Sequence, residues 1–255
     1  MEVISSVSNP KIKEILKLKD RKHRNKQKLF IVEGFHMIME AYNDQIIKTL
    51  LGTSKALEVL KDEIPNIEQV IEISENVAKK ISDTVTSQQI FAICSMPENT
   101  KIDFENNILL LDQIQDPGNL GTLIRSAASF NFKTVIASPN SVNFHNQKVL
   151  RSTQGNLFQV NLVNEYLVKV INQLHDNNYI IIGTSLHDDS KPLSKVKFDS
   201  DDKYALIIGN EGKGISPELL DLIDLNINIE MAENVDSINA AVAGSIIMYQ
   251  INNAK

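Results

Sequence analysis

The sequence has one cysteine and only short apolar runs, and each shortage excludes a class of protein. Cys94 cannot form an intramolecular disulfide or a cysteine-rich metal site, and within "IFAICSM" it is predicted to be a small buried residue of a cytosolic protein. The runs "NILLLD" and "YIIIG" fall far short of the ~18–20 residues of a membrane span. No apolar core follows the basic N-terminal stretch, so we expect no secretory signal and a cytoplasmic location.

The common catalytic signatures are also missing. There is no G-x-G-x-x-G, no G-x-x-x-x-G-K-[ST] and no G-x-S-x-G, which disfavours a nucleoside triphosphatase or a serine hydrolase of the elbow type. The five histidines show no pairwise ligand spacing, and the sequence predicts no metal site.

Charge is distributed unevenly along the 255 residues. The net charge is −6, yet residues 8–30 carry nine lysines and arginines and two acids, and no basic residue lies between Lys213 and Lys255. One end of the molecule is therefore suited to attract a polyanion.

Two stretches of alternating strand and helix patterns flank a polar segment. We predict a smaller α/β domain over residues 1–96, a linker over 97–106 and a second α/β domain over 107–255. In the second domain, continuous apolar runs alternate with helical patterns, which is typical of a parallel sheet covered on both faces. These runs are "NILLLD", "KTVIAS", "LFQVNL", "NYIIIGT", "YALIIG" and "LNINIE".

The two end helices are predicted in more detail. Residues 9–20 form a helix capped by Asn9, with Pro10 at its first position. The last helix, residues 237–251, is capped by Ser237 or Asp236 and is apolar or small on almost every side, so it must be buried all round. We favour burial against a second subunit, with burial inside its own domain as the alternative.

Three segments carry a functional signal. In "DPGNLGTLIRSAASF", Asn119 is the predicted cap of a helix that starts at Leu120, and Arg125 either reaches the surface or meets an anion. In "IIGNEGKGIS", three glycines allow close backbone approach to a ligand, but Glu211 would repel a phosphate. In "INIEMAENVDSINAAVAG", Asn239 lies where a polar side chain can face a ligand.

Together these segments resemble a known family. N-L-G-T-x-x-R, I-I-G-N-E-G-x-G-I and D-S-I-N-A-A-V-A-G, in that order, are similar to motifs 1, 2 and 3 of the SpoU/TrmH RNA 2′-O-ribose methyltransferases of the SPOUT superfamily, over residues 107–254. "SNPKIKEILKLKDRKHRNKQKLFIVEG" and "SDTVTSQQIFAI" resemble the L30e-like RNA-binding domain that precedes the catalytic domain in many members.

The resemblance implies a fold, a cofactor and a set of site residues. The implied C-terminal domain is a parallel-sheet α/β domain with a deep trefoil knot, works as a homodimer and binds S-adenosylmethionine. The matching catalytic positions are Arg125, Asn119, Glu211, Ser237 and Asn239. The matching cofactor positions are Gly209, Ile229 and Ile238, with neighbouring backbone at Ile208 and Met231. The basic cluster implied to bind RNA is Arg21, Lys22, Arg24, Lys26 and Lys28.

The role of Arg125 has two interpretations. Family proposals make the matching arginine a base, but a guanidinium with a pKa above ~12 is a poor proton acceptor. Alternatively, it grips a phosphate and stabilises the developing 2′-alkoxide, with Glu211 as its partner in the same chain or across the dimer.

Two positions depart from the family pattern. Glu230 stands where many members have proline, which places a charge beside the expected adenine pocket. Ala241 stands where many members have a second serine, which removes a hydroxyl near the start of the last helix.

Four functions are compatible with these sequence features. The preferred prediction is 2′-O-methylation of 23S ribosomal RNA, because the L30e-like domain favours ribosomal over transfer RNA. The alternatives are a transfer-RNA 2′-O-methyltransferase, a non-catalytic RNA-binding or ribosome-assembly protein, and a phosphate- or nucleotide-binding enzyme that uses the glycine loop.

Overall fold

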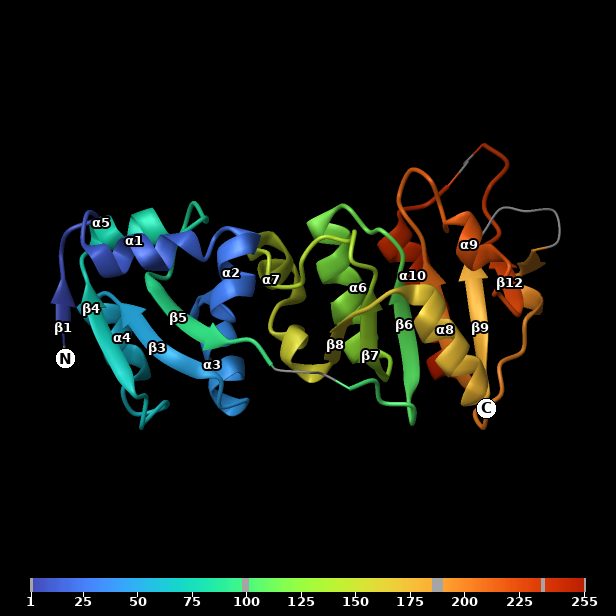
Figure 1. Ribbon diagram of the computed structural model, residues 1–255, viewed down its shortest axis with the longest axis horizontal. Coiled ribbons are helices and arrows are strands. Elements are labelled where there is room, and N and C mark those ends of the chain that lie inside the picture. The colour runs from blue at the N-terminus through green and yellow to red at the C-terminus, as the bar shows by residue number, and fades with distance from the viewer. Residues whose placement is uncertain (1, 98–100, 185–189, 235–236, 255) are drawn as a thin grey trace. The chain divides into compact units, whose positions relative to one another are not determined.

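A computed structural model describes residues 2–97, 101–184, 190–234 and 237–254. The chain divides into two compact units (Figure 1). The first comprises residues 1–98 and 145–158, and the second comprises residues 99–144 and 159–255.

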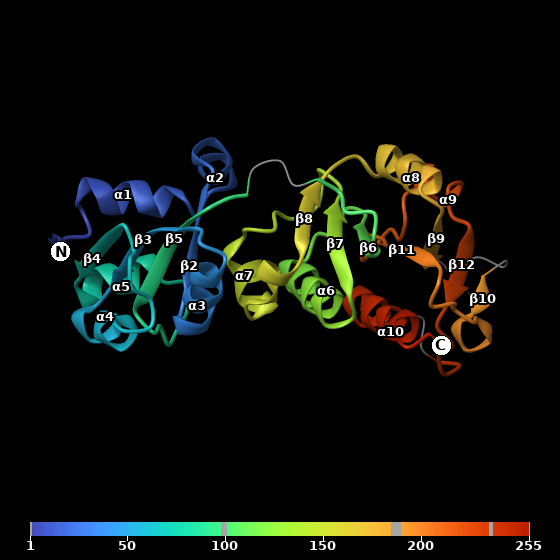
Figure 2. The same ribbon diagram turned by 90° about the horizontal axis from the view of Figure 1, so that it is seen from below.

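The first unit is a five-stranded mixed sheet with helices on both sides. The strand order is β1-β4-β3-β5-β2, and β5 runs antiparallel to both of its neighbours. Helices α1 and α5 share one hydrophobic core over the sheet, while α3 and α4 lie on the side opposite α1 (Figure 2). The strands are β1 (Glu2–Ile4), β2 (Leu29–Glu33), β3 (Ile47–Gly52), β4 (Gln69–Ile73) and β5 (Ile90–Ser95). The helices are α1 (Pro10–Lys17), α2 (Arg21–Gln27), α3 (Phe35–Asn43), α4 (Ser54–Leu60), α5 (Glu75–Ile81) and α7 (Gln147–Thr153).

Helix α1 forms as its sequence predicts. The Asn9 side chain accepts a hydrogen bond from the Lys11 backbone N–H at 2.8 Å, and Pro10 is the first helical residue. Ile12 and Ile15 are buried against the sheet. The cap and the apolar spacing therefore determine this element locally.

The basic cluster is divided between the surface and the interior. Arg24 is only 2% exposed, and its Nη1 donates to the carbonyl oxygens of Leu18 at 3.0 Å and Lys19 at 2.7 Å. Burial lowers the pKa of its guanidinium, and the nearby Asp20 partly opposes that shift. The prediction that Arg24 is available to RNA is wrong, because its charge is used to cap the end of α1. The four other members of the cluster are exposed: Arg21, Lys22, Lys26 and Lys28.

Residues 145–158 complete the first unit, although they follow two strands of the second unit in the chain. The Gln147 side chain donates to the Ile31 carbonyl of β2 at 2.9 Å. The ring of His145 packs on Phe30 with 4.3 Å between centroids, and burial there lowers the pKa of His145 to about 4. The sequence predicted two consecutive domains and did not indicate that residues 145–158 belong to the first unit.

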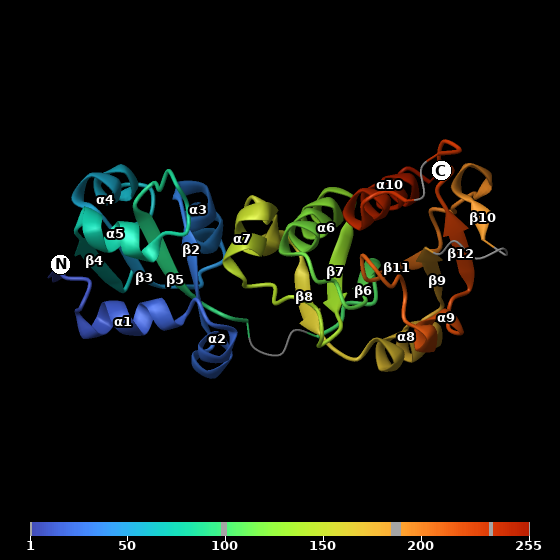
Figure 3. The ribbon, with the colours of Figure 1, turned by 90° about the horizontal axis from the view of Figure 1, so that it is seen from above.

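The second unit is built on a sheet of seven parallel strands in the described part of the chain. The strand order is β10-β12-β9-β11-β6-β7-β8. Helices α6 and α10 lie on one face, and α8 and α9 lie on the other (Figures 2 and 3). The strands are β6 (Asn107–Leu111), β7 (Phe132–Ala137), β8 (Asn161–Asn164), β9 (Tyr179–Thr184), β10 (Lys191–Pro192), β11 (Lys203–Ile208) and β12 (Leu225–Asn228). The helices are α6 (Pro117–Ser129), α8 (Leu167–Asp176), α9 (Pro217–Leu220) and α10 (Ala240–Asn252), with a 3-10 turn at Leu193–Lys195. A second 3-10 turn, at Asn156–Gln159, lies where the chain passes from the first unit to the second.

This architecture confirms the predicted parallel sheet covered on both faces. The run "LFQVNL" was assigned incorrectly in part, since its first residues form a 3-10 turn and the strand begins at Asn161. The trefoil knot implied by the resemblance stays a prediction. No helix among the described residues is long and apolar enough to cross a membrane.

Helix α10 is buried on one side only in the single chain. Its glycine packs so closely on α6 that a Cβ at Gly244 would lie 2.6 Å from Leu123 Cδ2. On the outer side, Val242, Ile246 and Tyr249 are 47%, 38% and 55% exposed. The alternative prediction, burial inside its own domain, is therefore wrong. One apolar stripe of α10 stays open in the single chain, and burial against a second subunit stays a prediction.

Candidate active site

The site is assembled where the three motif segments meet beside the carboxyl ends of β6 and β11. Motif 1 follows β6 and forms α6, motif 2 follows β11, and motif 3 leads into α10. Parallel strands bring their carboxyl ends to one edge of a sheet, which is where α/β folds place their ligands.

Glu211 of motif 2 binds the start of motif 1. Its Oε1 accepts from the Asp116 backbone N–H at 3.1 Å and from Asn119 Nδ2 at 3.0 Å, and its Oε2 accepts from the Gln115 N–H at 3.2 Å. A carboxylate at a helix N-terminus satisfies free N–H groups and matches the helix dipole. Among the described residues Glu211 forms no ion pair with Arg125, so the expected partnership within one chain is replaced by these contacts.

The environment of Glu211 favours its ionised form. Partial burial is the largest single influence and acts to raise its pKa. The hydrogen bonds from Asn119 and from the backbone N–H groups of Asp116 and Gln115 together outweigh burial, and the net pKa is lowered. The site therefore holds a fixed negative charge at neutral pH.

Asn119 and Asn239 extend this contact into a three-motif chain of hydrogen bonds. Asn239 Nδ2 donates to Asn119 Oδ1 at 2.8 Å, while Asn119 Nδ2 donates to Glu211. Asn239 Oδ1 in turn accepts from the backbone N–H groups of Ala241 and Val242. One side chain from each motif thus fixes the other two.

Both helix starts differ from the sequence prediction by about one turn. Helix α6 begins at Pro117, and Asp116 is the cap, accepting from the Asn119 N–H at 2.9 Å. Helix α10 begins at Ala240 with Asn239 as its cap, and not Ser237; Asp236 lies outside the described residues. Several capping residues stand close together in each segment, and the local sequence does not choose among them.

The glycine loop is shaped by contact with itself. Asn210 and Gly214 form a two-way backbone bridge with both N···O distances at 2.9 Å. A Cβ at Gly209 would lie 2.3 Å from the Gly214 carbonyl carbon, so only glycine fits there. Buried Asp112, at the end of β6, holds the far end of the loop by accepting from the Ser216 N–H and hydroxyl at 2.8 and 2.6 Å.

Two adjoining cavities open beside this loop, and they contain all five predicted cofactor residues. One has a volume of about 120 Å³ and is lined by residues that include Ile229, Met231 and Ile238. The other has a volume of about 440 Å³ and is lined by residues that include Ile208, Gly209 and Glu211. They share Thr184, Ser237, Ile238 and Ala243. Together they reach the usual ~300–1,000 Å³ of a small-molecule site.

The remaining predicted catalytic residues lie around this region. Ser237 lines both cavities. Arg125 is exposed on α6, six residues after Asn119, which corresponds to about 9 Å along the helix axis. The structure therefore joins Glu211, Asn119 and Asn239 directly and leaves the Arg125 side chain facing solvent.

The two departures from the family pattern have local explanations. Glu230 does not line the smaller cavity; its carboxylate accepts from the Ser194 hydroxyl and backbone N–H, and these bonds lower its pKa. Ala241 is 2% exposed, and its backbone N–H is bound by the Asn239 cap. Neither change interrupts the chain of hydrogen bonds.

Comparison with known proteins identifies this arrangement. The family model described as "SpoU rRNA Methylase family" matches residues 106–249. The chain belongs to the SpoU rRNA methylase family. It is an RNA methyltransferase that uses S-adenosylmethionine. Residues 9–92 match an MRM3-like substrate binding domain, which agrees with the second resemblance noted in the sequence.

Relatives of this SpoU methylase align over nearly its whole length. It is 35% identical over 252 residues to the 23S rRNA (guanosine(2553)-2′-O)-methyltransferase RlmP of Bacillus subtilis, with 98% of this chain and 99% of that protein covered. An S-adenosylmethionine-bound rRNA methyltransferase from Sinorhizobium meliloti superposes with a TM-score of 0.89 at 25% identity, covering 98% and 97% of the two chains. A TrmH-family protein from Porphyromonas gingivalis, described as a putative RNA methyltransferase, superposes with a TM-score of 0.86 at 27% sequence identity. The match covers 96% of this chain and 98% of that one.

The cavities of this SpoU methylase suit the cofactor of the family. Their walls combine apolar side chains with backbone and a few polar groups, and Glu211 places a negative charge where a sulfonium would be attracted. No group of three or more histidine, cysteine or acidic residues suited to a metal occurs in the described residues.

The sequence prediction missed two polar residues of the smaller cavity, Thr184 and Asn228. Both stand at the carboxyl end of a strand, β9 and β12, and this position is the signal that could have identified them.

Proposed function

We propose that this SpoU methylase transfers a methyl group to the 2′-oxygen of one ribose in 23S ribosomal RNA. The observation that carries the proposal is the match to RlmP, which extends through both units and not only through the catalytic motifs. The separate substrate-binding-domain match supports a structured RNA as the target. The first nucleotide to examine is the guanosine that corresponds to position 2553.

The residues of the two cavities would hold the cofactor, which when bound supplies an electrophilic methyl group. Ile229, Ile238 and Met231 enclose apolar parts, and the backbone of Ile208 and Gly209 approaches the ligand. The Glu211–Asn119–Asn239 chain of hydrogen bonds holds the loops that form these walls. The task of the protein is then mainly to align the ribose hydroxyl with the methyl group.

Arg125 would act on the RNA. Its exposed guanidinium can bind the phosphate beside the target ribose and stabilise negative charge as the 2′-oxygen loses its proton. A guanidinium stays protonated at neutral pH, which favours this electrostatic role over proton abstraction.

The proposal includes a cytoplasmic homodimer. The open stripe of Val242, Ile246 and Tyr249 on α10 offers an apolar face for a second copy. Phe130, which follows α6, extends it through an edge contact with Tyr249, with 5.6 Å between ring centroids. A dimer formed there would cover side chains that the single chain leaves in water.

The decisive experiment is labelled methyl transfer to 23S rRNA from cells that lack the protein. We expect one labelled nucleotide, mapped as a 2′-O-methyl ribose. Arg125→Ala should reduce transfer by about 10²–10³, the usual cost of removing one transition-state donor. Its stability should change by less than about 0.5 kcal/mol because the side chain is exposed.

The alternatives make different predictions in the same assay. Label in transfer RNA alone would contradict the choice of substrate. Binding of ribosomal RNA without incorporation into any RNA would contradict the enzymatic proposal and favour a ribosome-assembly role.

A further inference from the structure

One polar atom of the smaller cavity has no hydrogen-bond partner among the described residues. The Oδ1 atom of Asn228, at the end of β12, is buried and has no hydrogen-bond partner in the described part of the chain. An unpaired buried acceptor is destabilising, so such groups are rare and their occurrence needs an explanation. Asn228 also lines the cavity, so a ligand could reach it.

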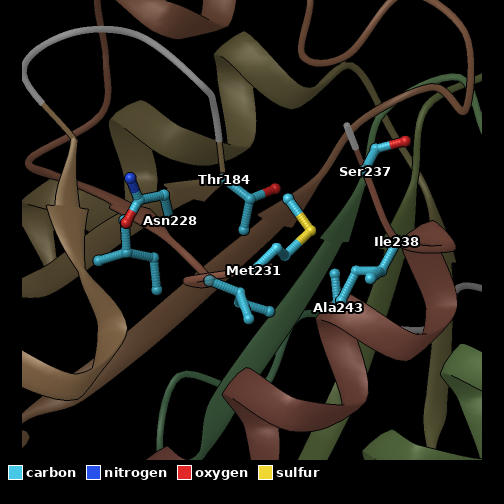
Figure 4. A pocket seen from close by; sticks show the side chains of 8 residues that line it. Thr184, Asn228, Met231, Ser237, Ile238 and Ala243 are labelled. Carbon is cyan, nitrogen blue, oxygen red and sulfur yellow. The ribbon is translucent and has the colours of Figure 1, made fainter. Parts of the chain in front are cut away.

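The cavity is mostly apolar and has a few polar groups. Figure 4 shows Thr184 and Asn228 on one side, Ser237, Ile238 and Ala243 from motif 3 on the other, and Met231 between them. A ligand that fills it must be mostly apolar and must carry a hydrogen-bond donor on one edge. Flat heteroaromatic rings have this character.

The size of the cavity limits which part of a ligand can enter. Its volume of about 120 Å³ is much smaller than the about 440 Å³ of the adjoining cavity. The smaller cavity is therefore assigned one ring system of a ligand, and the larger cavity the rest of it. The larger cavity beside it contains the fixed negative charge of Glu211, which suits the cationic part of such a ligand.

We propose that the side-chain amide of Asn228 recognises the amino edge of the adenine ring, with Oδ1 accepting a hydrogen bond from the 6-amino group. Asparagine is well matched to this edge, because its amide can accept from the 6-amino group and donate to the neighbouring ring nitrogen. Asn228 is thus a specificity-determining residue for the base of the cofactor. The inference rests on the proposed function, in which S-adenosylmethionine is the methyl donor.

The test is calorimetric binding with two ligands. One is S-adenosylhomocysteine, and the other is its analogue with hydrogen in place of the 6-amino group. Wild-type protein should bind the first about tenfold more tightly, as expected for one hydrogen bond to a buried acceptor. Asn228→Leu should weaken S-adenosylhomocysteine by about tenfold, leave the analogue within about twofold and so abolish the preference.

A second measurement separates recognition from a structural role. Because Asn228→Leu removes an unsatisfied buried acceptor, the ligand-free variant should melt at the same temperature as wild type or higher. Asn226→Leu is the matched control: it lies two residues earlier on β12, has an interaction of its own and does not line the cavity. It should leave the ligand preference unchanged.

The outcomes distinguish this inference from the function on which it rests. No binding of S-adenosylhomocysteine by wild-type protein would overturn the proposed function. Normal binding by wild type, with Asn228→Leu keeping the same preference for the 6-amino ligand, would overturn the role of Asn228 alone. Equal weakening of both ligands by Asn228→Leu would also overturn it, since that result indicates a general distortion.

Discussion

Single residues of the motif 2 loop are specified by contacts within the protein as well as by chemistry. Gly209 is required because the Gly214 backbone occupies the space of a side chain. Glu211 is required because three donors at the start of motif 1 point at one place. The glycine-rich loop that the sequence predicts to contact a ligand also links the segments that follow β6 and β11 by hydrogen bonds.

The first residue-scale prediction compares two glycines of this loop. Gly209→Ala should destabilise the protein by about 1–3 kcal/mol and weaken S-adenosylmethionine binding, because its Cβ must push the loop backbone apart. Gly212→Ala is the matched control, since its nearest neighbour would be 3.7 Å away, and it should stay within about 0.5 kcal/mol of wild type. Urea unfolding measures both variants. Equal stability of the two would show that the loop is not constrained as described.

The second concerns the pH dependence of Glu211. Its pKa is lowered on folding, so the stability it contributes is present above its ordinary pKa of 4.5 and is lost as pH falls through the lower folded value. Glu211→Gln should therefore be less stable than wild type at pH 7, and the difference should shrink below about pH 4.5. Unfolding curves between pH 7 and pH 3 test this expectation. A difference that grows in acid would contradict it.

Sequence reasoning reached some of these residues and missed others for identifiable reasons. Glu211, Asn119 and Asn239 were found because each stands in a motif, but the hydrogen bonds between them join positions about 90 to 120 residues apart, which no local pattern specifies. Arg24 was grouped with the surface lysines because a basic run does not show which member turns inward. Asn228 stands in none of the three motifs, and its position at the carboxyl end of β12 was its only sequence signal.

At the scale of elements, the start of α10 couples helix capping to the site. The Asn239 side chain uses its oxygen to cap the helix and its nitrogen to bind Asn119. Strands β6, β7, β9, β11 and β12 were predictable because buried parallel strands are continuous apolar runs, whereas β8 was predicted only in part and β10, two residues long, was not predicted. The start of α6 was not, because Gly118 within its first turn made that turn read as a loop.

The element-scale prediction separates the two tasks of Asn239. Asn239→Asp keeps an acceptor for the cap and loses the donor to Asn119, so stability should change little while methyl transfer falls. Asn239→Ala loses both and should cost about 0.5–2 kcal/mol in addition. Thermal melts and initial rates on the same samples decide between these results. If Asn239→Asp transfers methyl at the wild-type rate, the bond to Asn119 has no catalytic importance.

For the whole molecule, the arrangement of surface groups suggests two separate contact regions. Exposed basic side chains gather on α2 in the first unit, and the apolar stripe of α10 belongs to the second. The charge distribution of the sequence predicted the basic region. The small and apolar residues of the last helix predicted an apolar contact region, but not which of its side chains are exposed.

The first whole-molecule prediction concerns the RNA-binding surface. Replacing Arg21, Lys22, Lys26 and Lys28 by alanine should weaken RNA binding and reduce the slope of log affinity against log salt by about 0.7–0.9 for each phosphate that the protein no longer neutralises. Titrations between about 50 and about 300 mM salt provide the slope. Arg24→Ala should instead reduce stability, because the carbonyls of Leu18 and Lys19 lose their donor. An unchanged slope in the fourfold variant would place the RNA-binding surface elsewhere.

The second concerns the dimer. Sedimentation should show a dimer for wild type and a monomer for Val242→Glu combined with Ile246→Glu, because two carboxylates would be buried in an apolar contact. Val168→Glu adds charge at an exposed apolar position on α8, on the opposite face of the sheet from α10, and should remain dimeric. Monomeric wild-type protein would rule out the α10 interface.

The shared use of residues 145–158 has a consequence for how the chain is made. The first unit includes a segment that follows its last strand by about fifty residues, so this unit cannot be completed when residue 98 leaves the ribosome. Synthesis at about 5–20 residues per second delays the missing helix by roughly 3–12 s. During that interval the surface of β2 that Gln147 and His145 later cover is open to solvent and to other nascent chains. The first unit therefore cannot complete its fold until residues 145–158, which lie within the methylase part of the sequence, have been synthesised.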